Sequence, residues 1–343
     1  MDKISTCDTE LVQIIRDINA AQILFHPLIS PYGEINQKQL KHSSKPIIIS
    51  IDTNILIDLV HLCSGQKLSP DRIRIIALLM LWIECIGASC SCGQALQEIS
   101  YRQGAEQIKK YKYIYDMAWE RYTPNDWLIL YRGLEQKLPS VINERQSEED
   151  VTIYLDTSDG FLQAYASVLH MVILLRNQSL SAFEKTCQFV EWTYANTIAA
   201  KYVIAYAALL FSQAEEGISA PKKANSKNLE AVICGCKNQA WDLAHLSNWS
   251  RILHMEKTGD VEQNEVFIAT QDEDLKKVIM AAVESDDMRM FLRKYFTHAK
   301  TDELLQLMTK LKQRTIRADI QDLNYLSRLV ESEKDTLIST FEI

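Results

Sequence analysis

Four acidic residues stand where folding could bring them together, because each follows an apolar run or lies within a helical pattern. They are Asp52, Glu98, Asp242 and Asp272, with Asp274 as a substitute for the last. Two carboxylates about 4 Å apart repel by roughly 4 kcal/mol at an effective dielectric of about 20, so converging acids either bind protons or recruit cations. Ligands that offer only oxygen suit Mg²⁺ or Mn²⁺. Such ions activate water and stabilise the leaving oxygen when a phosphodiester is hydrolysed.

Asp52 follows the clearest strand pattern in the chain. The run Ile47–Ile51 is β-branched and apolar, which predicts a strand buried on both faces, as in a parallel sheet. Ligands of open α/β sheets bind outside the carboxyl ends of the strands, so Asp52 has the position of a functional acid. A helix N-cap made by Thr53 or Asn54 explains the same residues equally well.

The run Val266–Thr270 repeats this arrangement, since it is rich in β-formers and is followed by Asp272 and Asp274. Glu98 lies on the first turns of a helix predicted to begin at Gly93, after a short apolar segment that reads as a strand. An acid on a solvated helix surface, favoured by the N-terminal helix dipole, is the alternative for Glu98.

Asp242 lies in a predicted helix over Asn238–Leu253. His245 follows three residues later and could reach the same helix face. We expect His245 to be a packed or capping side chain rather than a metal ligand.

Composition limits the class of protein. The chain has 343 residues, of which 47% are hydrophobic, with 10 Gly and 7 Pro, as suits a helix-rich globular protein. Its length predicts one domain with a large insertion, or two domains. The net charge of −8 argues against a uniformly basic nucleic-acid binder. It does not exclude a nuclease, because bound metal ions reverse the local field of an acidic cluster.

The order of patterns predicts an α/β protein: a three-layer α/β/α core with a central parallel sheet, a large all-helical insertion and a helical C-terminal extension. The predicted parts are an N-terminal helical cap at 1–44, the core at 45–104 and 234–285, the insertion at 105–233 and the C-terminal helices at 286–343.

Two basic segments are candidates for nucleic-acid contact. The first is the loop that closes the insertion, with Lys222 and Lys223, which is either a solvated turn or a phosphate contact. The second is the C-terminal region, the most basic part of the chain, with Arg289, Arg293 and Lys294.

The sequence predicts a cytoplasmic protein with no membrane contact. The first nine residues lack the pattern of a signal peptide, and Tyr202–Phe211 is too short to cross a bilayer. The eight cysteines are therefore expected to be reduced. Two C-x-C pairs could hold zinc, but structural zinc sites usually use C-x₂₋₄-C spacing, so we do not favour zinc. The pairs are Cys90 with Cys92 and Cys234 with Cys236.

Four motifs in this order resemble the PIN domain. They are Ile-Asp-Thr-Asn-Ile-Leu-Ile-Asp at Asp52, Ala-Leu-Gln-Glu-Ile at Glu98, Asp-Leu-Ala-His-Leu at Asp242 and Phe-Ile-Ala-Thr-Gln-Asp-Glu-Asp-Leu at Asp272. The resemblance covers about 45–104 and 234–285. It implies a metal-dependent ribonuclease of three-layer fold whose four acids bind one or two divalent ions. It also implies supporting roles for Thr53 or Asn54 and for Thr270.

We therefore expect a metal-dependent endonuclease that uses Mg²⁺ or Mn²⁺, with RNA favoured over DNA. The alternatives are a DNA nuclease of a bacterial defence system and a non-catalytic PIN-like scaffold in a protein complex. The insertion is the expected surface for a protein partner or a second copy of the chain. A haloacid-dehalogenase-like phosphatase would need an acid where Asn54 stands, and a dinucleotide-binding turn would need glycine between Asp52 and Leu59.

Overall fold

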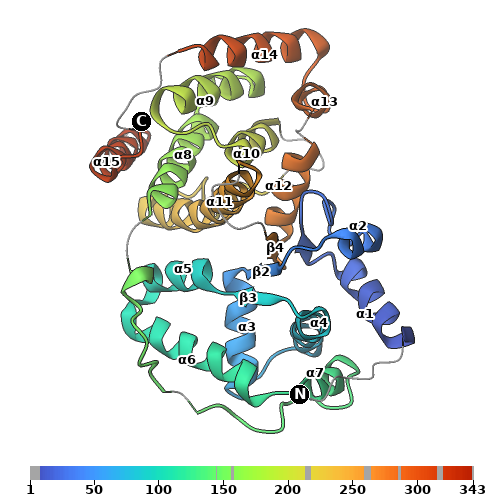
Figure 1. Cartoon of the computed structure of the whole chain (residues 1–343). Helices are drawn as coiled ribbons and strands as arrows, with labels where there is room; N and C mark the ends of the chain where they lie inside the picture. Colours follow the sequence, from blue (N-terminus) through green and yellow to red (C-terminus); the bar gives the residue numbers. More distant parts are fainter. Residues whose placement is uncertain are drawn as a thin grey trace. The chain divides into compact units, whose positions relative to one another are not determined.

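The computed structural model of the chain describes residues 8–143, 145–155, 158–212, 218–258, 264–284, 287–314 and 320–341, with the backbone alone at 8–11 and 253–258. The chain divides into two compact units (Figure 1). Unit 1 comprises Met1–Asp156 and Ile252–Asp272, and unit 2 comprises Thr157–Arg251 and Glu273–Ile343. The predicted insertion, 105–233, is thus shared between the units, because its first part up to residue 156 belongs to unit 1. Strands and helices together confirm the predicted α/β class.

Within the described residues, unit 1 holds a four-stranded sheet in the order β1-β4-β2-β3. The strands are β1 (Leu24–Phe25), β2 (Ile47–Ile51), β3 (Ser89–Ser91) and β4 (Glu265–Ala269). β2 runs parallel to β3 and β4, whereas β1 runs antiparallel to β4. The prediction of a parallel sheet was therefore wrong at one edge. At that edge, Leu24–Phe25 of the predicted helical cap forms the short strand β1, because its backbone pairs with that of β4.

The core of unit 1 lies on one side of β2. Ile49 and Ile51 are fully buried, whereas Ile47, Ile48 and Ser50 are only partly buried. The strand is therefore less enclosed than predicted. Ile49 and Ile51 join the buried apolar cluster of unit 1, so that face carries most of the hydrophobic stabilisation of the strand.

Seven described helices and one 3-10 turn complete unit 1 (Figure 1). They are α1 (Asp8–Ala21), α2 (Gln37–His42), α3 (Thr53–Cys63), α4 (Pro70–Ile86), α5 (Gly93–Gln103), α6 (Ala105–Arg121), α7 (Pro124–Tyr131) and η1 (Thr152–Tyr154). Ser69 caps the start of α4, and Gly87 ends it with a φ of 66°, a left-handed conformation that glycine adopts without strain. α4 packs against α1, α3 and α7, which explains why its sequence is apolar on almost every side.

Unit 2 contains helices and no strand among its described residues. They are α8 (Asp159–Arg176), α9 (Ala182–Asn196), α10 (Lys201–Ser212), most of α11 (Leu229–Thr258), α12 (Glu273–Glu284), α13 (Met288–Arg293), α14 (His298–Lys312) and α15 (Leu323–Ser339). The apolar stretch after α8 forms two helices, α9 and α10, rather than one long helix. The break falls at the β-branched pair Thr197 and Ile198, where Thr197 is extended.

In the part of the chain that the structure describes, one segment, Thr152–Arg176, is long and apolar enough to cross a membrane by length and composition. It contains α8, which packs against α9, α10 and α15. Most of the apolar part of this segment is buried inside the protein, as is typical of a core helix.

Candidate functional site

Asp52 sits between the end of β2 and the start of α3. Its Oδ1 accepts a hydrogen bond of 2.8 Å from the backbone N–H of Ile55, so Asp52 itself is the N-cap of α3. The alternative in which Thr53 or Asn54 caps the helix was therefore wrong. Oδ2 of Asp52 accepts a hydrogen bond from the hydroxyl of Thr270, the residue that follows β4. Asp52 is 5% exposed, and its contact with Thr270 ties the carboxylate to the end of the neighbouring strand.

Glu98, on α5, lies in the same unit and is also buried. The alternative of a solvated surface acid was wrong. The hydroxyl of Thr53 donates to Oε2 of Glu98 over 2.5 Å, and Nη2 of Arg102 lies 2.5 Å from Oε1. Thr53 directly follows Asp52 in the chain, so its hydrogen bond to Glu98 links the two buried acids.

Asp272 completes this group from the loop after β4. Its backbone N–H donates a 3.0 Å hydrogen bond to Oγ1 of Thr270, whose hydroxyl in turn donates to Asp52. The Asp272 side chain is partly exposed. We call Asp52, Glu98 and Asp272, together with Thr53 and Thr270, the acid cluster.

The electrostatics of the acid cluster follow from burial and from like charge. Burial, together with the charges of Asp272 and Glu98, raises the pKa of Asp52 to about 6, against the hydrogen bonds from Thr270 and Ile55. Burial also raises the pKa of Glu98, while Arg102 and the Thr53 hydroxyl lower it. Removing a carboxylate from water disfavours its charged form, so the cluster holds negative charge at an energetic cost.

The other predicted acids belong to unit 2. Asp242 lies on α11, where Nε2 of Gln239 is 3.3 Å from its Oδ2. Asp274 lies on α12, and its Oδ1 accepts a 3.4 Å hydrogen bond from the backbone N–H of Ser219. His245 is buried on α11, and burial lowers its pKa to about 4, so it is neutral at pH 7. It is a packed histidine, as expected.

The donor atoms of the acid cluster suit a hard divalent ion, since they are carboxylate and hydroxyl oxygens. As the side chains lie, no three His, Cys, Asp or Glu residues in the described ranges are arranged to hold a metal ion. The seven described cysteines, which include both C-x-C pairs, are free thiols. Burial raises the pKa of Cys90 and of Cys236 to about 12, which keeps them protonated.

Two of the basic side chains predicted to contact nucleic acid are already paired within unit 2. Arg289 forms an ion pair with Asp302, and Lys294 Nζ lies 2.6 Å from Glu284 Oε2. Arg293 is exposed at the end of α13, and Lys222 and Lys223 are exposed in a turn. Part of the positive charge predicted to contact nucleic acid is therefore balanced by nearby acids.

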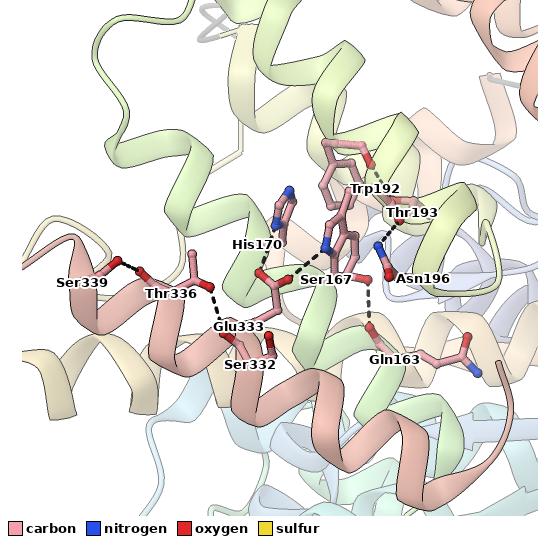
Figure 2. A network of polar contacts seen from close by, with 11 residues as sticks. Gln163, Ser167, His170, Trp192, Thr193, Asn196, Ser332, Glu333, Thr336 and Ser339 are labelled. Carbon is pink, nitrogen blue, oxygen red and sulfur yellow. Dashed lines mark hydrogen bonds and ion pairs between the residues drawn. The ribbon is translucent and has the colours of Figure 1, made fainter. Parts of the chain in front are cut away.

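Sequence reasoning missed two features. Arg102 stands four residues after Glu98, a spacing that predicts an ion pair on one helix face, so this partner could have been found. The second feature, shown in Figure 2, joins α15 to α8 and α9. Glu333 on α15 accepts a 2.9 Å hydrogen bond from Trp192 Nε1 and lies 2.9 Å from His170 Nδ1. No local pattern predicts it, because its residues are far apart in the chain.

Comparisons with protein-family models, with curated proteins and with solved structures gave no match for this chain. The class that the structure defines is an α/β protein with a small mixed sheet and a second, helical unit.

Proposed function

We propose that this chain is a metal-dependent endonuclease that hydrolyses phosphodiester bonds, with RNA favoured over DNA, and that the acid cluster is its centre. The observation that carries the proposal is geometric. Asp52 and Asp272 meet through the Thr270 hydroxyl at the ends of β2 and β4, and Thr53 connects Asp52 to Glu98. Ligand sites of open α/β sheets lie outside the carboxyl ends of parallel strands, which is where these residues stand.

The electrostatics of the cluster support this function. Asp52 is buried, and the charges of Asp272 and Glu98 add to the cost of its ionised form, while Arg102 forms an ion pair with Glu98. Buried negative charge of this kind favours the uptake of a cation. Mg²⁺ or Mn²⁺ held by Asp52, Glu98 and Asp272 would supply Lewis-acid chemistry, activating water and stabilising the leaving oxygen.

The chain's own residues have separate tasks in this proposal. Thr270 fixes the Asp52 carboxylate from the neighbouring strand, and Ile55 fixes its other oxygen. Thr53 contacts one carboxylate oxygen of Glu98 and Arg102 contacts the other. These contacts orient the carboxylates before any ligand binds, which reduces the cost of ordering the centre.

The strand order agrees with this assignment. β3, β2 and β4 are adjacent parallel strands, and α3, α5 and α12 begin within a few residues of their carboxyl ends. This is the arrangement that the PIN-like motifs lead us to expect, and the three-layer fold is part of the proposal. The proposed centre rests on the three acids of unit 1, while a role for Asp242 of unit 2 stays a prediction.

One observation favours the second candidate, a non-catalytic PIN-like scaffold. Both carboxylate oxygens of Asp52 and both of Glu98 already have protein partners, so the cluster can be read as a closed structural network. A scaffold of this kind would bind no metal and would cleave nothing.

Cleavage assays separate these candidates. The purified full chain is incubated with labelled single-stranded RNA, structured RNA and DNA in Mg²⁺, Mn²⁺ or chelator. The Asp52→Asn variant keeps the shape of the side chain and removes its charge. Asp71→Asn is the matched control, because Asp71 is an exposed acid on α4 in the same unit.

We expect metal-dependent cleavage that is retained in Asp71→Asn and lost in Asp52→Asn. Cleavage of RNA alone would fix the substrate class, and cleavage of DNA alone would select the DNA nuclease. Cleavage that survives Asp52→Asn, or no cleavage under any condition, would refute the nuclease and leave the scaffold.

A further inference from the structure

Unit 1 contains a second charged feature, an open cavity of about 980 Å³ between helices α1, α4 and α7. None of the residues of the acid cluster lines it. Its polar and charged lining residues are Gln13, Arg16, Asp17, Arg74, Tyr131 and Arg132. The volume lies at the upper end of the range for small-molecule sites. Three arginines against one aspartate make it locally positive in a chain whose net charge is −8.

Asp17 holds the neighbouring side chains on one wall of this cavity in place. Its Oδ2 lies 2.7 Å from Arg74 Nη2 and accepts a 2.7 Å hydrogen bond from the Tyr131 hydroxyl, and Oδ1 accepts one of 2.8 Å from Gln13 Nε2. The Arg74 guanidinium also lies over the Tyr131 ring, 5.6 Å from its centroid. Asp17 of α1 and Tyr131 of α7 thereby fix the position of the Arg74 guanidinium on α4.

This arrangement leaves the arginines competent to bind an anion. The negative charge of Asp17 is met by three donors, so it opposes an incoming anion less than an isolated carboxylate would. A guanidinium carries five N–H donors, so Arg74 can hold Asp17 and still donate to a ligand. Arg16 and Arg132 are exposed and line the same space. Planar, always-charged arginine suits phosphate oxygens better than any other side chain.

We propose that this cavity binds a phosphate ester of nucleotide size, carried either by a free nucleotide or by an RNA strand. The arginines contact the phosphate oxygens. The apolar lining of Val12 and Leu128 accommodates the rest of the ligand. The site is separate from cleavage, because it needs no metal ion and none of the acids of the acid cluster.

Calorimetric titration of the full chain in chelator tests this site without cleavage. The probes are ATP, a short single-stranded oligouridylate and inorganic phosphate. The test variant is the double substitution Arg16→Gln and Arg132→Gln, which changes two exposed side chains. Arg328→Gln is the matched control, because Arg328 is an exposed arginine on α15 in the other unit. Thermal unfolding checks that both variants fold like the original chain.

We expect ATP or the oligouridylate to bind saturably, with affinity at least about tenfold lower in the double variant and unchanged in Arg328→Gln. Tighter binding of the oligouridylate would identify an RNA strand as the source of the phosphates. Equal or tighter binding of ATP would identify a free nucleotide.

Three results would overturn the proposal: no saturable binding of either nucleotide probe, equal affinity in the double variant and the control, or inorganic phosphate binding as tightly as the nucleotides. The nuclease proposal fails through a different assay, since that one depends on metal and on Asp52.

Discussion

Two buried carboxylates, Asp52 in unit 1 and Glu333 in unit 2, have similar exposure and opposite surroundings. Asp52 is 5% exposed and Glu333 is 7% exposed, and each is contacted through both oxygens. Asp52 meets a backbone N–H and a hydroxyl, with two further acids nearby. Glu333 meets the indole N–H of Trp192 and the imidazole of His170 (Figure 2).

Glu333 connects helices through its two contacts, whereas Asp52 lies close to other negative charges. The rings of His170 and Trp192 stack with centroids 4.5 Å apart, so Glu333 fixes a packed aromatic pair beneath α15. Around Asp52, burial and the charges of Asp272 and Glu98 raise its pKa, against the hydrogen bonds from Thr270 and Ile55. Carboxyl groups whose pKa is shifted strongly by burial and by like charges, as that of Asp52 is, gather at functional sites. The two regions should therefore respond to substitution in opposite ways.

The largest expected difference is in cleavage. Glu98→Gln removes a charge from the acid cluster and should lower metal-dependent cleavage by about 100-fold, since even residues that only support metal ligands cost about 10- to 100-fold. Glu333→Gln removes a buried charge from unit 2 and should leave cleavage unchanged. Initial rates at saturating Mn²⁺ measure both. Equal losses in the two variants would mean that general destabilisation, and not the acid cluster, controls activity.

The next effect is a dependence of stability on pH. The pKa of Asp52 is raised from 3.8 to about 6, so the folded protein holds its proton more tightly than the unfolded chain. The stability of the folded state therefore falls as pH rises from about 4 to above 6, by up to about 3 kcal/mol. Asp52→Asn removes this loss.

Urea unfolding in chelator at several pH values measures this effect. The Asp52→Asn variant should be more stable than the original chain at pH 7.5 and equal to it near pH 4. If the two proteins keep the same difference at every pH, Asp52 is not the group responsible.

A smaller effect is expected for unit 2. Glu333→Ala leaves the Trp192 N–H without its carboxylate acceptor and His170 without its partner, which should lower the free energy of unfolding by about 2 kcal/mol. Glu331→Ala, on the exposed side of the same helix, should change it by no more than about 0.5 kcal/mol. Chemical denaturation followed by tryptophan fluorescence compares them. Matching values would show that the contacts of Glu333 contribute nothing net.

The smallest effect concerns the hydroxyl that fixes Asp52. Thr270→Val keeps the volume of a fully buried side chain and removes the donor to Asp52, which should cost about 1 kcal/mol and raise the pKa of Asp52 further. Thr301→Val is the control, because the buried Thr301 hydroxyl has no partner within the described residues.

The pH profile of cleavage measures the second part of this prediction. Its acidic limb should move to higher pH in Thr270→Val and stay in place in Thr301→Val. If the acidic limb of the pH profile does not move in either variant, Thr270 has no role in the proposed catalytic centre.

Local patterns were sufficient to predict much of unit 1. The strand at 47–51 was predicted from its β-branched run, and the run predicted over 266–270 forms β4 at Glu265–Ala269, with Asp52 and Asp272 after the strand ends. These features are set by neighbours in the chain. The short antiparallel strand β1 was missed, because two residues carry no periodic signal and only the edge of β4 makes them a strand.

The sequence by itself determined which acids follow strands and which residues could cap, pair or donate near them. Only the tertiary structure decided their partners. It joined Thr270 to Asp52 across 218 residues of chain and Glu333 to His170 across 163. It also placed Asp242 in a different unit from Asp52. Such contacts depend on burial and on the packing of distant elements, which local spacing does not encode. An acidic side chain is therefore surrounded by further acids in one unit and held by aromatic nitrogen atoms in the other.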